Sequence, residues 1–202
     1  MIQGYFDKIY VLNQETRADR WKQFQDEAAR VGITKHERIL SLPADQPYQS
    51  FCLSQQHLLK TFLDSGGVNL LALEDDVIFK GLGHFEAAMQ QIGYAWDILY
   101  LGVNVLDPHP ERISNHIFRI RAGWATHAVA YSRAAAEYIV SNYQGWEQDG
   151  MYDDWLSRKV LPNVNAYVIS PMVAWQRPGY SDLWSRPVEY GWVHIDQKLS
   201  EL

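Results

Sequence analysis

The sequence predicts an α/β protein in which helices flank a mostly parallel central sheet. In the first half of the chain, short runs of β-branched and aromatic residues alternate with segments whose apolar residues recur at helical spacing. This alternation is typical of βαβ units, which build parallel sheets. One strand-like run, residues 70–73, leads into the three carboxylates Glu74, Asp75 and Asp76. Ligands of open α/β sheets bind at the carboxyl ends of strands, so this tripeptide marks the candidate site.

Length and composition are ordinary for a globular protein and exclude several classes. The chain has 202 residues, 47% of them apolar and 21% charged, and we expect one domain over residues 1–202. The net charge of −6 argues against a nucleic-acid-binding protein, which needs a basic surface. The single cysteine, Cys52, excludes an internal disulfide and a cysteine-built metal site.

We expect a cytoplasmic protein without a transmembrane segment. The first residues show no basic segment followed by an apolar one, and no apolar run approaches the ~20 residues that span a bilayer. The acidic balance argues against a polybasic lipid anchor but leaves a local patch for peripheral membrane association open. The oligomeric state is open as well.

The first half of the chain predicts two strands and two helices. Residues 5–12 form the first strand, and a second strand runs into Glu74. A helix is expected to begin with Thr16 as its cap and to end at Gly32, and another covers residues 55–63. Residues 39–48 contain two prolines and predict an irregular loop.

The second half predicts helices and strands in less regular order. The expected helices cover residues 84–92, 132–143 and 149–159, and the expected strands cover 96–101, 117–121, 125–131 and 166–170. Ser132 should cap the helix that follows it. Residues 103–115 and the chain from 171 onward predict irregular structure, the latter rich in Trp, Tyr and Pro.

The acidic tripeptide favours a cation site. Three adjacent carboxylates repel one another and cannot all be buried without a cation or hydrogen-bond donors. A hard divalent cation prefers such oxygen ligands. Mg²⁺ and Mn²⁺ usually keep coordination positions open for phosphate oxygens, so the tripeptide points to a metal that holds a phosphorylated ligand. The alternative is a solvated acidic strand end.

Six segments in order along most of the chain form a recognisable set of motifs. They are residues 9–13 (Ile-Tyr-Val-Leu-Asn) with Arg17 and Arg20 after them, 54–62 around His57, 73–77 (Leu-Glu-Asp-Asp-Val), 96–102 (Trp-Asp-Ile-Leu-Tyr-Leu-Gly), 126–135 around His127, and the pairs Asp153 with Leu156 and Ser181 with Asp182. This set resembles glycosyltransferase family 25, which includes lipopolysaccharide and lipooligosaccharide galactosyltransferases. Two positions depart from the family pattern, since Gln56 stands where a serine precedes the histidine and Gln14 or Glu15 replaces the Asp of the first turn.

The resemblance implies a GT-A type fold and an inverting transferase. The implied donor is a nucleotide-sugar, expected to be UDP-linked with galactose as the hexose, and the implied acceptor is a surface glycan or lipopolysaccharide. A divalent metal, Mn²⁺ or Mg²⁺, is implied as cofactor. Two other classes stay open: a catalytically silent homologue that binds nucleotide or glycan as an accessory module, and a nucleotidyltransferase. The second would need a Gly-rich loop with a lysine, which the sequence lacks.

Within this resemblance, the acidic residues divide into two groups. Asp76 is the expected metal ligand with Glu74, and Glu74 or Asp75 contacts the ribose or a metal-bound water. Inversion needs a carboxylate that takes the proton of the acceptor hydroxyl, and Asp153 and Asp154 are the candidates. Their alternative role is to complement a helix dipole at its N-terminus.

The remaining candidates would bind the two substrates. The donor is expected to be bound by residues that follow the first strand, namely Asn13, Arg17 and Arg20, because arginine can bind a phosphate through two hydrogen bonds. For the arginines, the alternative is a solvated basic face. The residues expected to bind substrate are His57, His127, Ser181 and Asp182, with structural roles as the alternative. Fold analogy alone suggests His194 as a second metal ligand. An apolar platform for a sugar ring is one role expected for Trp175, Trp184, Tyr190 and Trp192, and core packing or an oligomer contact is the alternative.

Overall fold

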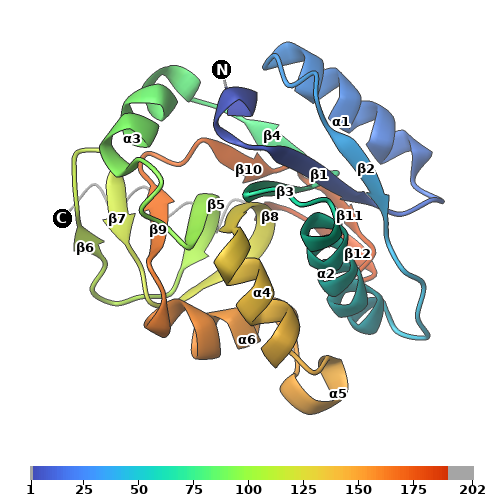
Figure 1. Ribbon diagram of the computed structural model, residues 1–202. Coiled ribbons are helices and arrows are strands. Elements are labelled where there is room, and N and C mark those ends of the chain that lie inside the picture. The colour runs from blue at the N-terminus through green and yellow to red at the C-terminus, as the bar shows by residue number, and fades with distance from the viewer. Residues whose placement is uncertain (1, 191–202) are drawn as a thin grey trace.

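A computed structural model describes residues 2–190 and contains a central eight-stranded sheet with helices on both faces (Figure 1). The strand order is β2-β1-β3-β8-β5-β9-β7-β6. These strands are β1 (Lys8–Asn13), β2 (Glu37–Leu40), β3 (Asn69–Glu74), β5 (Ile98–Val105), β6 (Glu111–Arg112), β7 (Ile117–Arg119), β8 (Gly123–Ser132) and β9 (Ala166–Ile169). Two small antiparallel pairs join β4 (Val77–Phe79) to β10 (Ala174–Gln176) and β11 (Gly179–Ser181) to β12 (Arg186–Val188).

The central sheet is mixed, and this corrects the prediction of a mostly parallel sheet. Strand β1 pairs parallel with β2 and β3, and β5 pairs parallel with β9. However, β8 lies antiparallel between β3 and β5, and β7 is antiparallel to β9 and β6. A parallel return requires a long crossover, usually a helix. The chain between β5 and β8 forms no helix, so it comes back along β5 in the opposite direction.

Helices cover the two faces of the sheet unequally. The helices are α1 (Ala18–Arg30), α2 (Pro47–Asp64), α3 (Phe85–Ile92), α4 (Arg133–Asn142), α5 (Trp146–Asp149) and α6 (Tyr152–Trp155). Short helical turns are η1 (Ile2–Tyr5), η2 (Leu82–His84), η3 (Leu156–Val160), which is a π-helical turn, and η4 (Leu161–Asn163). One core cluster joins the sheet to α1 and α3, and the other joins it to α2, α4 and α6.

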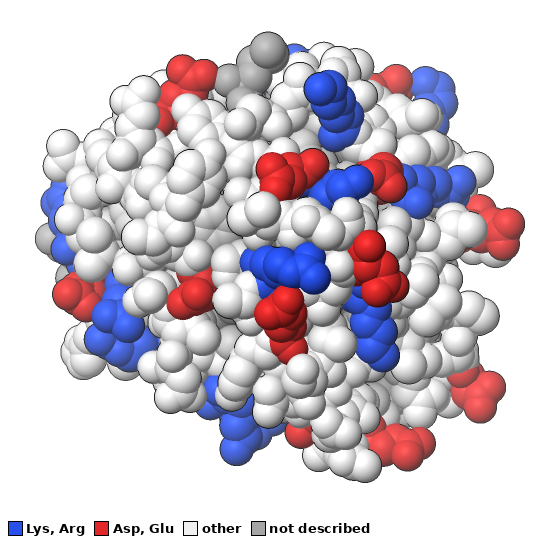
Figure 2. Space-filling model, viewed as in Figure 1, with Lys and Arg blue, Asp and Glu red and all other residues white. Residues whose placement is uncertain are grey.

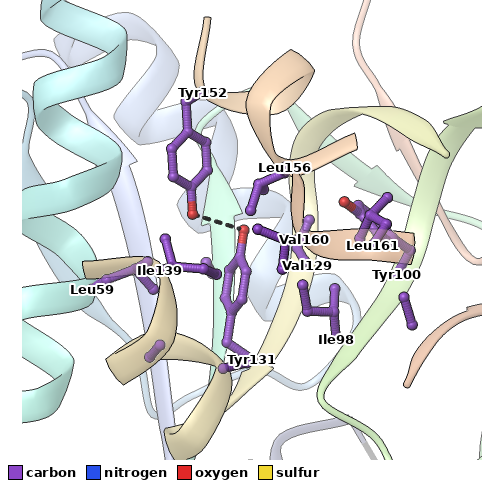
Figure 3. Packing of buried hydrophobic residues seen from close by; sticks show 14 of the residues in the cluster. Leu59, Ile98, Tyr100, Val129, Tyr131, Ile139, Tyr152, Leu156, Val160 and Leu161 are labelled. Atoms are coloured by element: carbon purple, nitrogen blue, oxygen red, sulfur yellow. Dashed lines mark hydrogen bonds between the residues drawn. The ribbon is translucent and has the colours of Figure 1, made fainter. Parts of the chain in front are cut away.

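Alternating side chains of the same strands supply both cores. In β3, Leu70 belongs to the cluster under α2 and α4, whereas Leu71 belongs to the cluster under α1 and α3. Figure 3 shows the first cluster, in which the Tyr152 hydroxyl donates to the Tyr131 hydroxyl at 3.5 Å among aliphatic side chains. A strand buried on both faces reads as a continuous apolar run. This explains why the strand leading into Glu74 is so easily recognised in the sequence.

The ends of the helices confirm one prediction from the sequence and contradict two others. The Ser132 cap is confirmed, since its Oγ atom accepts a hydrogen bond from the Ala135 amide at 3.1 Å. The Thr16 cap is wrong, because Arg17 occupies the cap position and α1 begins at the following residue. The predicted helix over 149–159 is interrupted at Gly150, whose left-handed φ of 79° separates α5 from α6.

Several other helices and strands extend beyond the ranges that the sequence predicted. Helix α2 begins at Pro47, a residue type whose fixed φ suits the first helical turn, so the predicted loop over 39–48 is shorter. That segment also gives its first residues to β2. Strand β5 continues through Gly102, where it was expected to end. The segment after residue 171 forms β10, β11 and β12 instead of staying irregular.

Charge on the surface is mixed. Figure 2 shows acidic and basic side chains interspersed over the drawn face, with wide neutral areas between them. Among the described residues, no helix is both long enough and apolar enough to cross a bilayer.

Candidate active site

A pocket of about 140 Å³ lies at the edge of the sheet where β1 and β3 end. Its wall is formed by the ends of β1 and β3 and the residues after them, by one residue of α1 and one directly after β2, by the first half of α2, and by the end of β11 with the residues after it. The lining residues are Leu12, Asn13, Gln14, Arg20, Ser41, Pro47, Ser50, Phe51, Ser54, Gln55, Glu74, Asp75, Asp76, Ser181, Asp182 and Leu183. Because β8 is antiparallel to β3, its amino end reaches the same edge and brings Thr126 to Glu74. We call this pocket the strand-end pocket.

Both carboxylate oxygens of Asp75 have protein partners. The Asn13 Nδ2 atom donates to Asp75 Oδ2 at 2.5 Å, and the Arg20 Nη1 atom donates to Asp75 Oδ1 at 3.2 Å. Burial raises the pKa of Asp75, and the bonds from Asn13 and Arg20 oppose that shift. The Arg38 Nε atom in turn donates to Asn13 Oδ1 at 2.8 Å, and the Arg38 guanidinium lies 5.0 Å from the centre of the Trp21 ring. Asp75 is therefore fixed by a network that spans β1, β2 and α1.

Glu74 is held from the opposite side. The Thr126 hydroxyl donates to Glu74 Oε1 at 2.7 Å, and the Gln55 side-chain amide of α2 donates to the Thr126 hydroxyl at 3.2 Å. Burial, together with repulsion from Asp76, raises the pKa of Glu74 to about 8.

Asp76 is buried and incompletely paired. Its Oδ1 atom has no hydrogen-bond partner within residues 2–190, although the side chain is only 7% exposed. Burial, reinforced by the charge of Asp75, raises the pKa of Asp76 to about 7. A buried carboxylate oxygen without a partner is costly, and a cation or a donor on a ligand would satisfy it.

The carboxylates of the strand-end pocket fit a divalent cation that is also bound by the phosphates of a ligand. They do not fit a metal site built from protein side chains alone. In the described part of the chain, no group of three or more His, Cys, Asp or Glu residues is arranged to hold a metal ion. Mg²⁺ and Mn²⁺, however, are commonly bound by one or two carboxylates together with phosphate oxygens and water. The unpaired Asp76 Oδ1 atom meets that requirement.

The two expected phosphate-binding arginines are engaged with acidic groups. The Arg17 Nη1 atom lies 2.5 Å from Asp182 Oδ2, and its Nη2 atom lies 3.0 Å from Asp19 Oδ2. Besides its bond to Asp75, Arg20 donates to the carbonyl oxygen of Tyr180. The arginines thus tie the segment around β11 to the strand-end pocket, and they balance part of its negative charge.

A second pocket of about 320 Å³ adjoins the first, and the two share walls at Phe51, Glu74 and Leu183. We call it the aromatic pocket, because Trp124, Trp184 and Tyr190 contribute to its wall. The other lining residues are Asn104, Ala125, Thr126, Met151, Asp153, Asp154 and Gln176. One ligand can therefore extend from the strand-end pocket toward a second ligand in the aromatic pocket.

The structure distinguishes Asp153 from Asp154. Asp153 Oδ2 accepts a hydrogen bond from the Ala125 amide at 3.4 Å, and burial raises the pKa of Asp153. Ala125 has a left-handed φ of 83°, which is strained for a residue with a side chain and occurs where surrounding structure enforces it. Asp154 instead forms an ion pair with Arg158 at 2.7 Å. Within residues 2–190, Asp153 is the carboxylate of the two that has no cationic partner.

Neither predicted histidine lines these two pockets. His127 is fully buried, its Nε2 atom lies 3.3 Å from the Ala174 carbonyl oxygen, and burial lowers its pKa to about 4. His57 is half-buried on α2, and its carbonyl oxygen accepts a bond from Thr61 within the helix. The structure thus places neither histidine at the two pockets, whereas Gln55 of α2 lines the strand-end pocket and donates to the Thr126 hydroxyl.

The late predicted residues divide between the two pockets. Ser181 and Asp182 line the strand-end pocket, whereas Trp184 and Tyr190 line the aromatic pocket. Trp175 packs against the core cluster under α2 and α4. Trp192 and His194 lie outside the described residues.

Sequence reasoning missed Arg38, Asn104 and Trp124. Arg38 reaches Asn13 only because β2 pairs parallel with β1, and no local pattern indicates that pairing. Asn104 and Trp124 face each other across β5 and β8, in the part of β5 that was expected to be irregular. The sequence feature that could have identified them is a polar or aromatic residue at the end of an apolar strand.

The comparisons establish the fold. No family model matches the sequence, and a search of curated proteins found no match. Among solved structures, A197 from STIV has a TM-score of 0.53 at 11% identity, covering 89% of this chain and 91% of that one. A glycosyltransferase involved in the glycosylation of the major capsid of PBCV-1 also has a TM-score of 0.53 at 11% identity, covering 96% and 100%. The chain therefore shares the α/β fold of these two structures, one of which is a glycosyltransferase, and this agrees with the fold that the resemblance predicted.

Proposed function

We propose that this protein is an inverting glycosyltransferase that moves a hexose from a nucleotide-sugar to a hydroxyl of a glycan acceptor. The single observation that carries the proposal is the buried, unpaired Asp76 Oδ1 atom at the strand-end pocket, beside a second pocket that presents Asp153. One of the two solved structures described above is a glycosyltransferase, which supports the proposal at the level of architecture.

In this proposal the strand-end pocket binds the donor. Asn13, Glu74 and Asp75 line it and present fixed polar groups to a nucleoside diphosphate. Arg17 and Arg20 would contact its phosphates by exchanging their present carboxylate and carbonyl partners. The motif resemblance to family 25 supports UDP-galactose as the first donor to test and a lipopolysaccharide-type glycan as the acceptor class.

Asp76, with Glu74 beside it, would hold a divalent cation, Mn²⁺ or Mg²⁺. When bound, such a cation stabilises the negative charge that develops on a leaving diphosphate. It would also remove the cost of the unpaired buried carboxylate oxygen in this chain.

The aromatic pocket would bind the acceptor. Inversion requires that the acceptor hydroxyl attack from the face opposite the leaving group, with its proton passing to a carboxylate. Asp153 has a raised pKa and no cationic partner, so it suits that proton better than Asp154. Trp124 and Trp184 are 41% and 60% exposed, and they would stack on the faces of acceptor sugar rings.

The test is release of UDP from UDP-galactose and other UDP-hexoses with Mn²⁺ and a panel of glycan acceptors. We expect acceptor-dependent release by the wild type and a loss of about 10²-fold or more in Asp76→Asn. The matched control is Asp26→Asn, an exposed acidic residue of α1 that pairs with Lys22, which should keep wild-type activity. Failure of the wild type to release UDP with every donor would contradict the proposal. Binding of UDP without release would instead identify the silent accessory homologue.

A further inference from the structure

A third pocket lies apart from the two that the proposed function uses. It has a volume of about 520 Å³ and lies between the 43–45 loop, the first half of α2 and α5. Figure 1 shows α5 beside the amino-terminal end of α2. The lining residues are Pro43, Ala44, Asp45, Gln49, Cys52, Leu53, Gln144, Gly145, Trp146, Glu147 and Gln148. None of them lines the strand-end pocket or the aromatic pocket.

Five polar side chains of this pocket have no partner in the part of the chain that the structure describes. The side chains of Gln49, Gln144 and Gln148 make no hydrogen bond within residues 2–190, and neither Asp45 nor Glu147 forms an ion pair there. Three planar amides and two carboxylates thus supply donors and acceptors to whatever enters. Paired donors and acceptors of this kind match vicinal hydroxyl groups.

The charge of the pocket wall disfavours an anionic ligand. Within the described residues the lining contains no Lys or Arg, while Asp45 and Glu147 are acidic. Phosphates, nucleotides and other anions are therefore disfavoured. A quaternary ammonium group would need a cage of separate aromatic faces. Within the described residues, Trp146 is the one aromatic residue of the wall, and Tyr48 packs on it with ring centroids 4.1 Å apart.

Trp146 supplies an apolar ring to the pocket wall. Trp146 is half-buried, backed by Tyr48 of α2, and belongs to the pocket wall. An indole ring with fixed backing stacks well on the C–H face of a sugar ring, while amides and carboxylates at its edge bind the hydroxyls. The pocket is also close to the aromatic pocket, because Cys52 lines it and the preceding residue of α2, Phe51, lines the aromatic pocket.

We propose that this α2–α5 pocket is a saccharide-binding site that takes a neutral sugar unit, separate from the site of transfer. Trp146 stacks on the sugar ring, and Gln49, Gln148 and Glu147 bind its hydroxyls. In a glycan acceptor that enters the aromatic pocket, a more distant sugar unit would reach this site. The site itself needs neither donor nor metal, so it can be tested without them.

The test is an NMR titration of the ¹⁵N-labelled full chain with methyl glycosides of glucose, galactose and mannose, and with lactose, maltose and cellobiose. The Trp146 indole N–H signal is assigned by its absence in Trp146→Phe. We expect at least one saccharide to shift this signal in a saturable manner. The double variant Gln49→Ala/Gln148→Ala should bind that saccharide about tenfold more weakly, since each lost hydrogen bond weakens affinity by several-fold. Gln25→Ala, an exposed glutamine on α1, is the matched control and should bind normally.

Two outcomes would overturn the proposal. One is the absence of a Trp146 shift with every saccharide, including the case in which only the Trp124 or Trp184 indole responds. The other is a shift that survives unchanged in the double variant. Repeating the titration with Asp76→Asn separates this proposal from the proposed function, because the Trp146 response should persist in that variant whether or not the strand-end pocket binds a nucleotide.

Discussion

Asn13 and Asp75 meet across 62 positions of sequence, with the Asn13 Nδ2 atom 2.5 Å from the Asp75 Oδ2 atom. Asn13 is the last residue of β1, and Asp75 directly follows the last residue of β3. The parallel register pairs Leu12 with Glu74, so the two side chains reach the same edge of the sheet together. This contact fixes the middle carboxylate of the tripeptide, whereas Asp76 keeps a buried oxygen that has no partner within residues 2–190.

Asn13→Ala should destabilise the protein by about 1–3 kcal/mol. The change removes a partner from the buried Asp75 carboxylate and from the Arg38 guanidinium, and unpaired buried polar groups carry a desolvation cost of that size. Urea denaturation at neutral pH measures the effect. Asn142→Ala is the control, because that exposed amide donates only to the Tyr138 carbonyl within α4. Equal, small effects of the two substitutions would show that the network does not stabilise the fold.

Asp153→Asn should lower the rate of sugar transfer by about 10²–10⁴-fold while UDP binding stays at the wild-type level. The asparagine keeps the shape of the side chain but cannot accept the proton of the acceptor hydroxyl. Asp154→Asn removes a partly exposed ion pair with Arg158 and keeps the shape of the side chain in the pocket wall, so its maximal transfer rate should fall far less than that of Asp153→Asn. Steady-state kinetics with both variants separates the two roles. An unaffected Asp153→Asn enzyme would mean that another group takes the proton.

Gly102→Ala should destabilise the protein by about 3 kcal/mol or more. A Cβ atom at this position would lie 2.0 Å from the Ala174 carbonyl oxygen and 2.6 Å from His127 Nε2, and the backbone cannot move aside cheaply. Thermal unfolding measures the loss. Gly83→Ala is the control, because a Cβ there meets nothing within 4 Å. A melting temperature of Gly102→Ala equal to that of the control would contradict this close packing of β5 and β10.

The buried His127 should make the fold sensitive to mild acid. Burial holds its pKa at about 4 in the folded state, below the ordinary ~6.5 of an unfolded chain. The unfolded state therefore binds an additional proton between these values. The stabilisation is complete above about pH 6.5 and is lost as the pH falls toward 4. At about 1.4 kcal/mol per pKa unit, the loss amounts to about 3 kcal/mol.

The measurement is the free energy of unfolding at pH 7 and at pH 4 for the wild type and for His127→Gln. The glutamine keeps a polar group near the Ala174 carbonyl but takes up no proton, so other titrating groups affect both proteins alike. The wild type should lose about 3 kcal/mol more than the variant over this interval. Parallel pH profiles would show that His127 is not the buried neutral histidine of this account.

The sequence predicted the α/β class and the position of the acidic tripeptide because both depend on local patterns. The apolar run before Glu74 is continuous since β3 is buried on both faces, and Ser132 caps α4 through a contact three residues away. The antiparallel direction of β8 was also open to prediction, because no helical pattern separates it from β5. Local patterns therefore predict the type of each element better than they predict the order and direction in which the strands pair.

The parts that the sequence did not predict depend on long-range pairing. Arg38 becomes part of the site only through the register of β2 on β1, and Trp124 only through the pairing of β8 with β5. His127 fits a familiar motif, yet its strand turns the side chain into the core, where Gly102 leaves room for it. Side-chain type and spacing could not separate that burial from a role in binding.

The proposed function depends most on a nucleotide–metal site at Asp76. Calorimetric titration of UDP with and without Mn²⁺ tests this site most directly. Wild-type protein should bind UDP in a Mn²⁺-dependent manner, and Asp76→Asn should lose that dependence while unfolding at the wild-type temperature. Equal binding of UDP by Asp76→Asn with Mn²⁺, or no binding by the wild type under either condition, would contradict the central claim.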